Sequence, residues 1–221
     1  MLECRAMPFD ITDFKSLMRL EPHGPDVFVG IGPAYPWGRV YGGQVVAQAL
    51  RAAYATVDPE HHVHSLHAYF IRGGDYDEPI RFEVDRIRNG RSFLTRRVVA
   101  RQSVGPILNL SASFQIREDQ ADVQEAKMPE GAPRPADLAE NNWGPILSRR
   151  MLSEEQAGSR VESGCWLRVE RELGDDPVLQ ACALAYASDD IPTDAASKSH
   201  PLHVGVENEL EGYGETFVCL L

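Results

Sequence analysis

One stretch of small residues, followed by four stretches in which polar and apolar residues alternate, most constrains the fold of this 221-residue chain. The first stretch follows a glycine-marked turn over residues 38–43 and runs from Gln44 to Val57, with apolar residues at helical spacing. A helix here could lie close against another backbone because it carries small side chains, including Ala47, Ala49, Ala52 and Ala53. After Pro59 the period changes from about 3.6 residues to 2, which is typical of strands. We predict a buried helix followed by a sheet.

Four long strands are predicted after this helix, over residues 63–71, 79–88, 92–102 and 106–116. Asn89-Gly90, between the second and third strands, is the strongest short hairpin signal. The pattern predicts an antiparallel meander. A small-residue helix before such strands suggests a sheet curled round the helix, so the expected fold class is α+β.

The second half of the chain begins with a predicted linker, residues 118–145, which has several prolines among acidic groups and no periodicity. Residues 164–170 then alternate like a strand, and Asp176-Pro177 predicts the start of a helix over residues 178–187 that is again rich in small residues. We therefore expect a quasi-repeat, with an N-terminal unit over 1–117 and a partial second unit over 146–221. The sequence ends inside an apparent strand, 215–221.

The net charge of −11 is unevenly distributed along the chain. Residues 1–117 carry 14 basic and 12 acidic side chains, whereas residues 118–221 carry 8 and 21. A strongly acidic chain argues against duplex nucleic acid as a partner, because neutralising phosphates needs a basic face. Only the first half could hold a small polyanion.

The sequence also indicates the cellular compartment in which the protein is expected. No window approaches the roughly 18 apolar residues of a membrane span, and an acidic residue, Glu3, comes too early for a signal peptide. The four cysteines have no C-x-x-C pair and no framework spacing: Cys4, Cys165, Cys182 and Cys219. We expect reduced thiols and a cytoplasmic location.

Four closely spaced histidines look like a metal cluster: His61, His62, His64 and His67. On a regular strand, however, His62 and His64 would face one way and His67 the other, so no tetrahedral set converges and no metal is expected. His64 or His67 could still face a substrate; the alternative is an ordinary strand histidine. Dinucleotide and phosphate-loop motifs are missing, so we expect no cofactor.

Two features point to chemistry at helix ends. Gly42, Gly43 and Gln44 start the first helix, where free N–H groups could hold a carbonyl oxygen as it gains charge; alternatively, the glycines only permit tight packing. Asp189 and Asp190 follow the second helix, where the dipole disfavours carboxylates. Such breaks of a local rule concentrate at functional sites, although an Asp-rich turn is the alternative.

Arginines crowd the predicted hairpin around Asn89-Gly90: Arg86, Arg88, Arg91, Arg96, Arg97 and Arg101. The simplest interpretation is a solvated strand face. The sharper one is a docking surface for a phosphorylated ligand.

Several motifs together resemble one family, the type II acyl-CoA thioesterases. The likeness runs from about Phe14 onward, with the motifs in order and at fitting separations. The segments that carry it are GRVYGGQVVAQAL (38–50), VHSLHAYF (63–70), RNGRSF (88–93), SASFQ (111–115) and YASD within AYASD (185–189).

The resemblance implies a tandem double hotdog, each unit a long helix wrapped by an antiparallel sheet, and hydrolysis of fatty acyl-CoA to free acid and coenzyme A. In this family an Asp, a Thr or Ser and a Gln from the second hotdog hold the attacking water. The Asp maps onto Asp189, which would orient and deprotonate the water, with Asp190 as the neighbouring alternative. Arg88 and Arg91 would be candidate contacts for the CoA phosphates, and sheet edges would join copies into a homo-oligomer.

The other two catalytic partners cannot be carried over, because the family's strands that supply them would follow Leu221. We therefore expect a C-terminally truncated second unit with slow turnover, since losing oriented partners of a catalytic water costs on the order of 10²-fold in rate. A frameshift or a complementing partner chain would also fit. The alternative function is a catalytically impaired acyl-CoA binding or assembly module. A hotdog hydratase is a weaker alternative, because no Asp/His pair has a supporting spacing.

Overall fold

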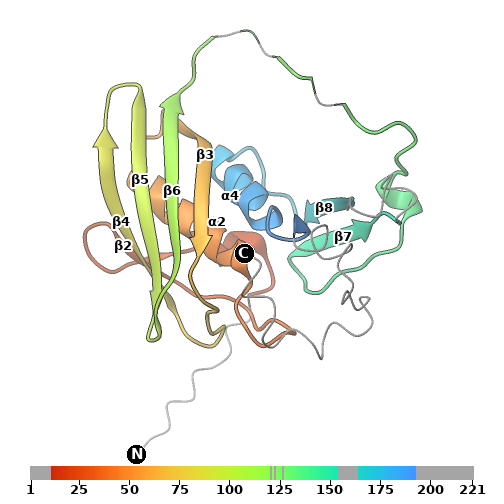
Figure 1. The fold of residues 1–221 in the computed structure, drawn as a ribbon, viewed down its shortest axis with the longest axis horizontal. Helices are drawn as coiled ribbons and strands as arrows, with labels where there is room; N and C mark the ends of the chain where they lie inside the picture. Colours follow the sequence, from red (N-terminus) through yellow and green to blue (C-terminus); the bar gives the residue numbers. More distant parts are fainter. Residues whose placement is uncertain (1–10, 120, 122, 126, 154–163, 193–221) are drawn as a thin grey trace, which may run out of the picture.

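Two helices lie between two antiparallel sheets (Figure 1). The computed structural model describes residues 11–119, 121, 123–125, 127–153 and 164–192. A six-stranded sheet wraps helix α2 (Gly42–Tyr54), and helix α4 (Pro177–Ala187) packs beside α2. The two-stranded sheet, β7 (Leu147–Met151) and β8 (Cys165–Val169), lies beyond α4. Among the described residues, no helix is long and apolar enough to cross a membrane.

The predicted strands are confirmed with small changes at their ends. The large sheet contains β1 (Glu21–Pro22), β2 (Val27–Gly30), β3 (His61–Phe70), β4 (Ile80–Asn89), β5 (Phe93–Gln102) and β6 (Gly105–Ile116). Two short helical segments complete the described elements, α1 (Phe14–Leu17) and the 3-10 turn η1 (Pro135–Asp137). The strand expected over 215–221 lies outside the described residues, as do Cys4 and Cys219.

The meander prediction is wrong for one strand. The sheet order is β1-β2-β4-β5-β6-β3, so β3 pairs with β6 and not with β4. Tight turns keep β4, β5 and β6 adjacent, but the nine residues 71–79 separate β3 from β4. Nine residues can span roughly 30 Å, more than the roughly 15 Å across three strand spacings, so the connection does not force adjacency.

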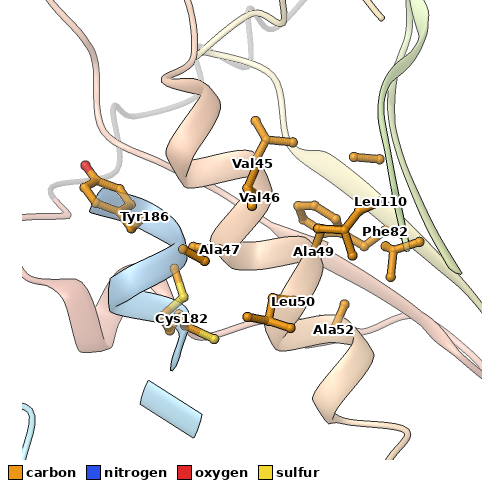
Figure 2. Packing of buried hydrophobic residues seen from close by; sticks show 14 of the residues in the cluster. Val45, Val46, Ala47, Ala49, Leu50, Ala52, Phe82, Leu110, Cys182 and Tyr186 are labelled. Atoms are coloured by element: carbon orange, nitrogen blue, oxygen red, sulfur yellow. The ribbon is translucent and has the colours of Figure 1, made fainter. Parts of the chain in front are cut away.

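Helix α2 is buried on nearly all sides, as its small residues predicted. One face meets the sheet and the other meets α4. Figure 2 shows Ala47 directed toward α4 beside Cys182 and Tyr186, and Ala49 directed toward Phe82 and Leu110 of the sheet. Alanine at these positions keeps the partner backbones close.

The order of elements repeats along the chain. An antiparallel strand pair, β1 with β2, precedes α2, and another pair, β7 with β8, precedes α4. The predicted start of α4 is confirmed, because the Asp176 carboxylate accepts the backbone N–H groups of Val178 and Leu179 (2.9 and 3.3 Å) and Pro177 is the first helical residue.

Helices α2 and α4 approach each other closely at Gly43. A Cβ built on this residue would lie 2.2 Å from the backbone oxygen of Tyr186 in α4. A side chain there would force the two helices apart, because backbone cannot move aside as a flexible side chain can.

We therefore expect Gly43→Ala to lower the free energy of unfolding by about 2 kcal/mol, measured by urea denaturation. The matched control is Gly144→Ala, since a Cβ on Gly144 meets nothing within 4 Å. Equal stabilities of the two variants would contradict this packing role.

Candidate functional site

The two groups of residues that the sequence predicts at helix ends meet in the structure. Asp189 follows the C-terminal end of α4, and its carboxylate accepts a hydrogen bond from the backbone N–H of Gly43 at the N-terminal end of α2. The N-cap residue of α2, Tyr41, provides no side-chain cap of its own. Asp189 therefore supplies the missing cap from another helix, at the positive end of the α2 dipole.

Gly42 allows this carboxylate to come close. A Cβ on Gly42 would lie 2.5 Å from Asp189 Oδ2 and 2.8 Å from the Phe70 ring carbon Cε1. The carboxylate is thus bordered by the Gly42 backbone and by an aromatic ring from β3. Tight packing and close approach of a charged group are both reasons for the glycine pair.

Burial makes Asp189 a stronger proton acceptor than an ordinary aspartate. Desolvation raises the pKa of Asp189 from 3.8 to about 6. The hydrogen bond from Gly43 opposes this rise, and the nearby charge of Asp190 adds to it. A carboxylate with a pKa near 6 is ionised at neutral pH and is still basic enough to take a proton from water.

Asp190 is held differently from Asp189. Arg149 on β7 donates from Nε to one carboxylate oxygen (2.7 Å), and the Trp143 indole Nε1 donates to the other (2.9 Å). The side chains of Asp190 and Arg149 are 2% and 15% exposed, so this ion pair is buried. Each oxygen of Asp190 thus accepts a hydrogen bond from a neighbouring side chain.

Aromatic rings enclose the helix ends. The Tyr41 hydroxyl donates to the backbone oxygen of Tyr186 (2.9 Å), and its ring lies 4.9 Å from the rings of Tyr186 and Trp143. Burial, together with the nearby charges of Asp189 and Asp190, raises the pKa of Tyr41, so its hydroxyl stays protonated and remains a donor. The rings of Tyr35 and Trp37 extend the same cluster.

Gln44, the third predicted residue at the start of α2, belongs to a buried network. Its backbone N–H donates to the Tyr41 oxygen, and its side chain accepts from the Tyr35 hydroxyl (2.7 Å) and donates to Gln48 (3.3 Å). Gln48 in turn donates to the backbone oxygens of Leu17 and Ile31. The structure therefore brings Gly42 and Gly43 to Asp189 and uses Gln44 to fix the helix start.

The histidines of β3 lie away from this site. The prediction that His67 faces opposite to His62 and His64 is wrong, because a β-bulge after Val63 inserts an extra residue and restores His67 to the outer face. There His64 Nε2 lies 2.9 Å from Ser113 Oγ, and His67 packs on Tyr69. Within the described part of the chain, no group of three His, Cys, Asp or Glu side chains is placed to hold a metal ion.

Three of the arginines, Arg88, Arg91 and Arg96, lie near the opposite end of α2. Arg96 is buried and donates to the Thr56 hydroxyl (2.7 Å) and the Thr56 backbone oxygen (2.9 Å), just beyond the C-terminal end of the helix. Arg88 and Arg91 are exposed at the β4–β5 hairpin beside it. A 13-residue helix, roughly 20 Å long, separates this hairpin from Asp189.

Most of the other arginines form ion pairs on the sheet. Arg86 makes two hydrogen bonds to Asp26 (2.9 and 2.8 Å), Arg97 pairs with Asp85, and Arg101 pairs with Glu83. These pairs agree with the simpler interpretation of a solvated strand face. The buried role of Arg96 was missed, because alternation alone does not separate a buried cation from an exposed one.

Sequence reasoning also missed Trp143 and Arg149. Trp143 stands in the segment predicted as a linker, and β7 was not predicted. A large aromatic residue among acidic and proline residues is the signal that could have revealed a packed segment.

Comparisons with known proteins agree on a family. A family model described as "Acyl-CoA thioesterase N-terminal domain" matches residues 32–115, and one described as "Acyl-CoA thioesterase" matches residues 136–210. The chain is 31% identical to "Acyl-CoA thioesterase 2" of Haemophilus influenzae over 199 residues, covering 78% of this chain and 68% of that protein.

Solved structures give the same result. An acyl-CoA thioesterase II, TesB2, from Mycobacterium marinum is 33% identical to this chain, with a TM-score of 0.70. The match covers 86% of this chain and 71% of the Mycobacterium chain. A protein with a hot dog fold from Alicyclobacillus acidocaldarius is 21% identical and has a TM-score of 0.66. The match covers 87% of this chain and 74% of that chain, and at this identity it supports the fold alone. The chain belongs to the type II acyl-CoA thioesterase family, and its expected α+β hotdog fold is confirmed.

The matches to two mammalian relatives are shorter. The human and mouse proteins named "Acyl-coenzyme A thioesterase 8" are 42% and 40% identical to this chain, but the matches span 38% and 39% of their lengths.

The raised pKa of Asp189 affects stability as well as reactivity. Because this pKa is about 6 in the folded chain and 3.8 in its ordinary state, the folded chain binds the proton more tightly. The resulting stabilisation is fully present below about pH 4 and is lost as the pH rises through about 6. Ionised Asp189 therefore lowers the stability of the fold at pH 8.

We expect Asp189→Asn to raise the free energy of unfolding at pH 8 by roughly 1–3 kcal/mol, with a smaller difference at pH 5. Asparagine keeps an oxygen for the Gly43 N–H and removes the buried charge. Urea denaturation at both pH values measures the effect, and the exposed Asp175→Asn is the control. A loss of stability at pH 8 would contradict the assignment.

Proposed function

We propose that this protein hydrolyses fatty acyl-CoA thioesters to a free fatty acid and coenzyme A, with Asp189 activating the water. Family membership supports the reaction class. The observation that carries the residue assignment is the partly buried Asp189 carboxylate, which has a pKa near 6 and lies against the N-terminal end of α2. No cofactor takes part in this proposal.

The proposed step uses one water and one thioester. Asp189 accepts a proton from the water, whose oxygen attacks the carbonyl carbon to give a tetrahedral oxyanion. The positive end of α2, at Gly42 and Gly43, favours the negative charge that develops beside it. The carbon–sulfur bond then breaks, and the thiolate leaves and takes up a proton, giving the carboxylic acid and coenzyme A.

The other residues predicted from the sequence would contact the substrate away from Asp189. Arg88 and Arg91 would bind the CoA phosphates, and their exposure on a hairpin supports access to a charged ligand. His64 and His67 lie on the outer sheet face, where any role toward a substrate would be separate from the chemistry at Asp189. Residues 1–117 and 146–221 would form the two tandem units, joined by 118–145.

We also propose a cytoplasmic location and a homo-oligomer joined through sheet edges. The scattered cysteines and the lack of a membrane-spanning helix among the described residues are compatible with the cytoplasm. The ten-residue strand β3 at the edge of the described sheet offers unpaired backbone groups to a second copy. Sedimentation should give at least twice the mass of one chain, and a monomer would count against the proposal.

Release of free thiol from acyl-CoA substrates tests the function. We expect the wild-type chain to release thiol above background and Asp189→Ala to be slower by 10²-fold or more, because the water loses its proton acceptor. The control is Asp175→Ala, an exposed aspartate just before α4. Equal nonzero rates for wild type and Asp189→Ala would remove Asp189 from the mechanism.

The rate should also depend on pH. Asp189 must be ionised to accept a proton, so kcat/KM should fall as the pH drops through about 6. A rate that stays constant from pH 8 to pH 5 would argue against an aspartate base. Calorimetric binding of acyl-CoA without any turnover would instead favour the impaired binding module.

A further inference from the structure

A buried ion pair stands one residue beyond the proposed base. Asp190 accepts from Arg149 through one oxygen and from Trp143 through the other, and its side chain is 2% exposed. An aspartate in an exposed turn would gain little from such partners. This pair is instead largely buried, with the Arg149 side chain 15% exposed.

Arg149 is itself held from several directions. Its NH1 donates to the backbone oxygen and the side-chain oxygen of Asn141 (3.0 and 3.2 Å), and its backbone N–H donates to the Asn142 side chain (2.7 Å). The guanidinium is thus fixed in position by the segment that leads into β7. A planar group held in this way sets both the distance and the angle of its carboxylate partner.

Asp190 passes this constraint to the end of α4. Its backbone N–H donates to the Ala187 oxygen (3.2 Å), which closes a turn around Asp189. Asp189 is therefore held on one side by the Gly43 N–H and on the other by a neighbour whose side chain cannot move freely.

We propose that Arg149, Asp190 and Trp143 form a positioning clamp that fixes the C-terminal end of α4 and thereby orients the Asp189 carboxylate against α2. The clamp residues do not touch the reacting atoms; they act through Asp189. This inference rests on the proposed function for its effect on turnover, but the orientation and charge of Asp189 can be measured without turnover.

The clamp has an electrostatic consequence. The titratable groups that interact with Asp189 are Asp190 beside it and Tyr41 before α2. Asp190 in turn pairs with Arg149 on β7 and acts on Tyr186 of α4. Both tyrosines have pKa values raised by burial and stay neutral, so Asp190 and Arg149 are the charges that matter. The charge of Asp190 raises the pKa of Asp189. Arg149 is the ion-pair partner of that Asp190 charge.

Four variants separate the effect of the Asp190 charge on Asp189 from the effect of the clamp on the position of Asp189. Asp190→Asn removes the negative charge, Arg149→Gln leaves Asp190 uncompensated, and Arg149→Lys keeps the charge but loses the planar fork. The matched control is Arg150→Gln, because Arg150 is the next residue on β7 and pairs with Glu140 and not with Asp190. The full chain is used throughout, with circular dichroism to check folding.

Carbon-13 NMR titration of Asp189, assigned with Asp189→Asn, gives the first readout. We expect the midpoint to move to lower pH in Asp190→Asn, to higher pH in Arg149→Gln, and to stay at the wild-type value in Arg149→Lys and Arg150→Gln. Identical midpoints in wild type and Asp190→Asn would overturn the electrostatic role. Asp190→Asn keeps the shape of the side chain, so this comparison stands even if Arg149→Gln does not fold.

Turnover of acyl-CoA gives the second readout. We expect kcat to fall on the order of tenfold in both Arg149→Gln and Arg149→Lys, with KM little changed, because a misplaced base slows chemistry and not binding. Wild-type kcat in Arg149→Lys would overturn the geometric role. Equal thiol release by wild type and Asp189→Ala would overturn the proposed function instead, while the NMR titration would still decide whether the clamp controls Asp189.

Discussion

The close contact between the end of α4 and the start of α2 is the interaction on which the rest of this structure depends. A Cβ at position 43 would lie 2.2 Å from the backbone oxygen of Tyr186, and one at position 42 would lie 2.5 Å from a carboxylate oxygen of Asp189. The contact joins the two helices, and through them the two sheets. It also places a negative side chain at the positive end of a helix dipole, so the same approach that packs the core builds the site.

Asp189 and Asp190 show how neighbouring residues of one type acquire different roles. Asp190 forms an ion pair with Arg149 and accepts a hydrogen bond from Trp143, so each of its oxygens has a donor. Asp189 has a backbone N–H as its partner, and burial raises its pKa to about 6. A carboxylate that is costly to ionise reduces stability and increases basicity, which is the usual compromise at a reactive site.

Much of the fold could be predicted because the relevant patterns are local. Alternation marked the four long strands, small residues marked α2, and the Asp176-Pro177 cap marked α4. Strand order could not be read this way, because the connection from β3 to β4 is long enough to allow either neighbour. The prediction of the side-chain direction of His67 was wrong for a related reason. A bulge in the β3–β6 pairing inserts one extra residue, which reverses the alternation of side chains beyond it.

The sequence by itself determined the kinds of elements, the uneven charge and the presence of an aspartate that its own helix disfavours, because these depend on residues close together in the chain. The tertiary structure decided what that aspartate does. It brought the N-terminal end of another helix to Asp189, made Asp190 one half of a buried ion pair and placed Arg88 and Arg91 at the far end of α2. Those outcomes depend on contacts between segments 40 or more residues apart in the chain, and no local pattern encodes such contacts.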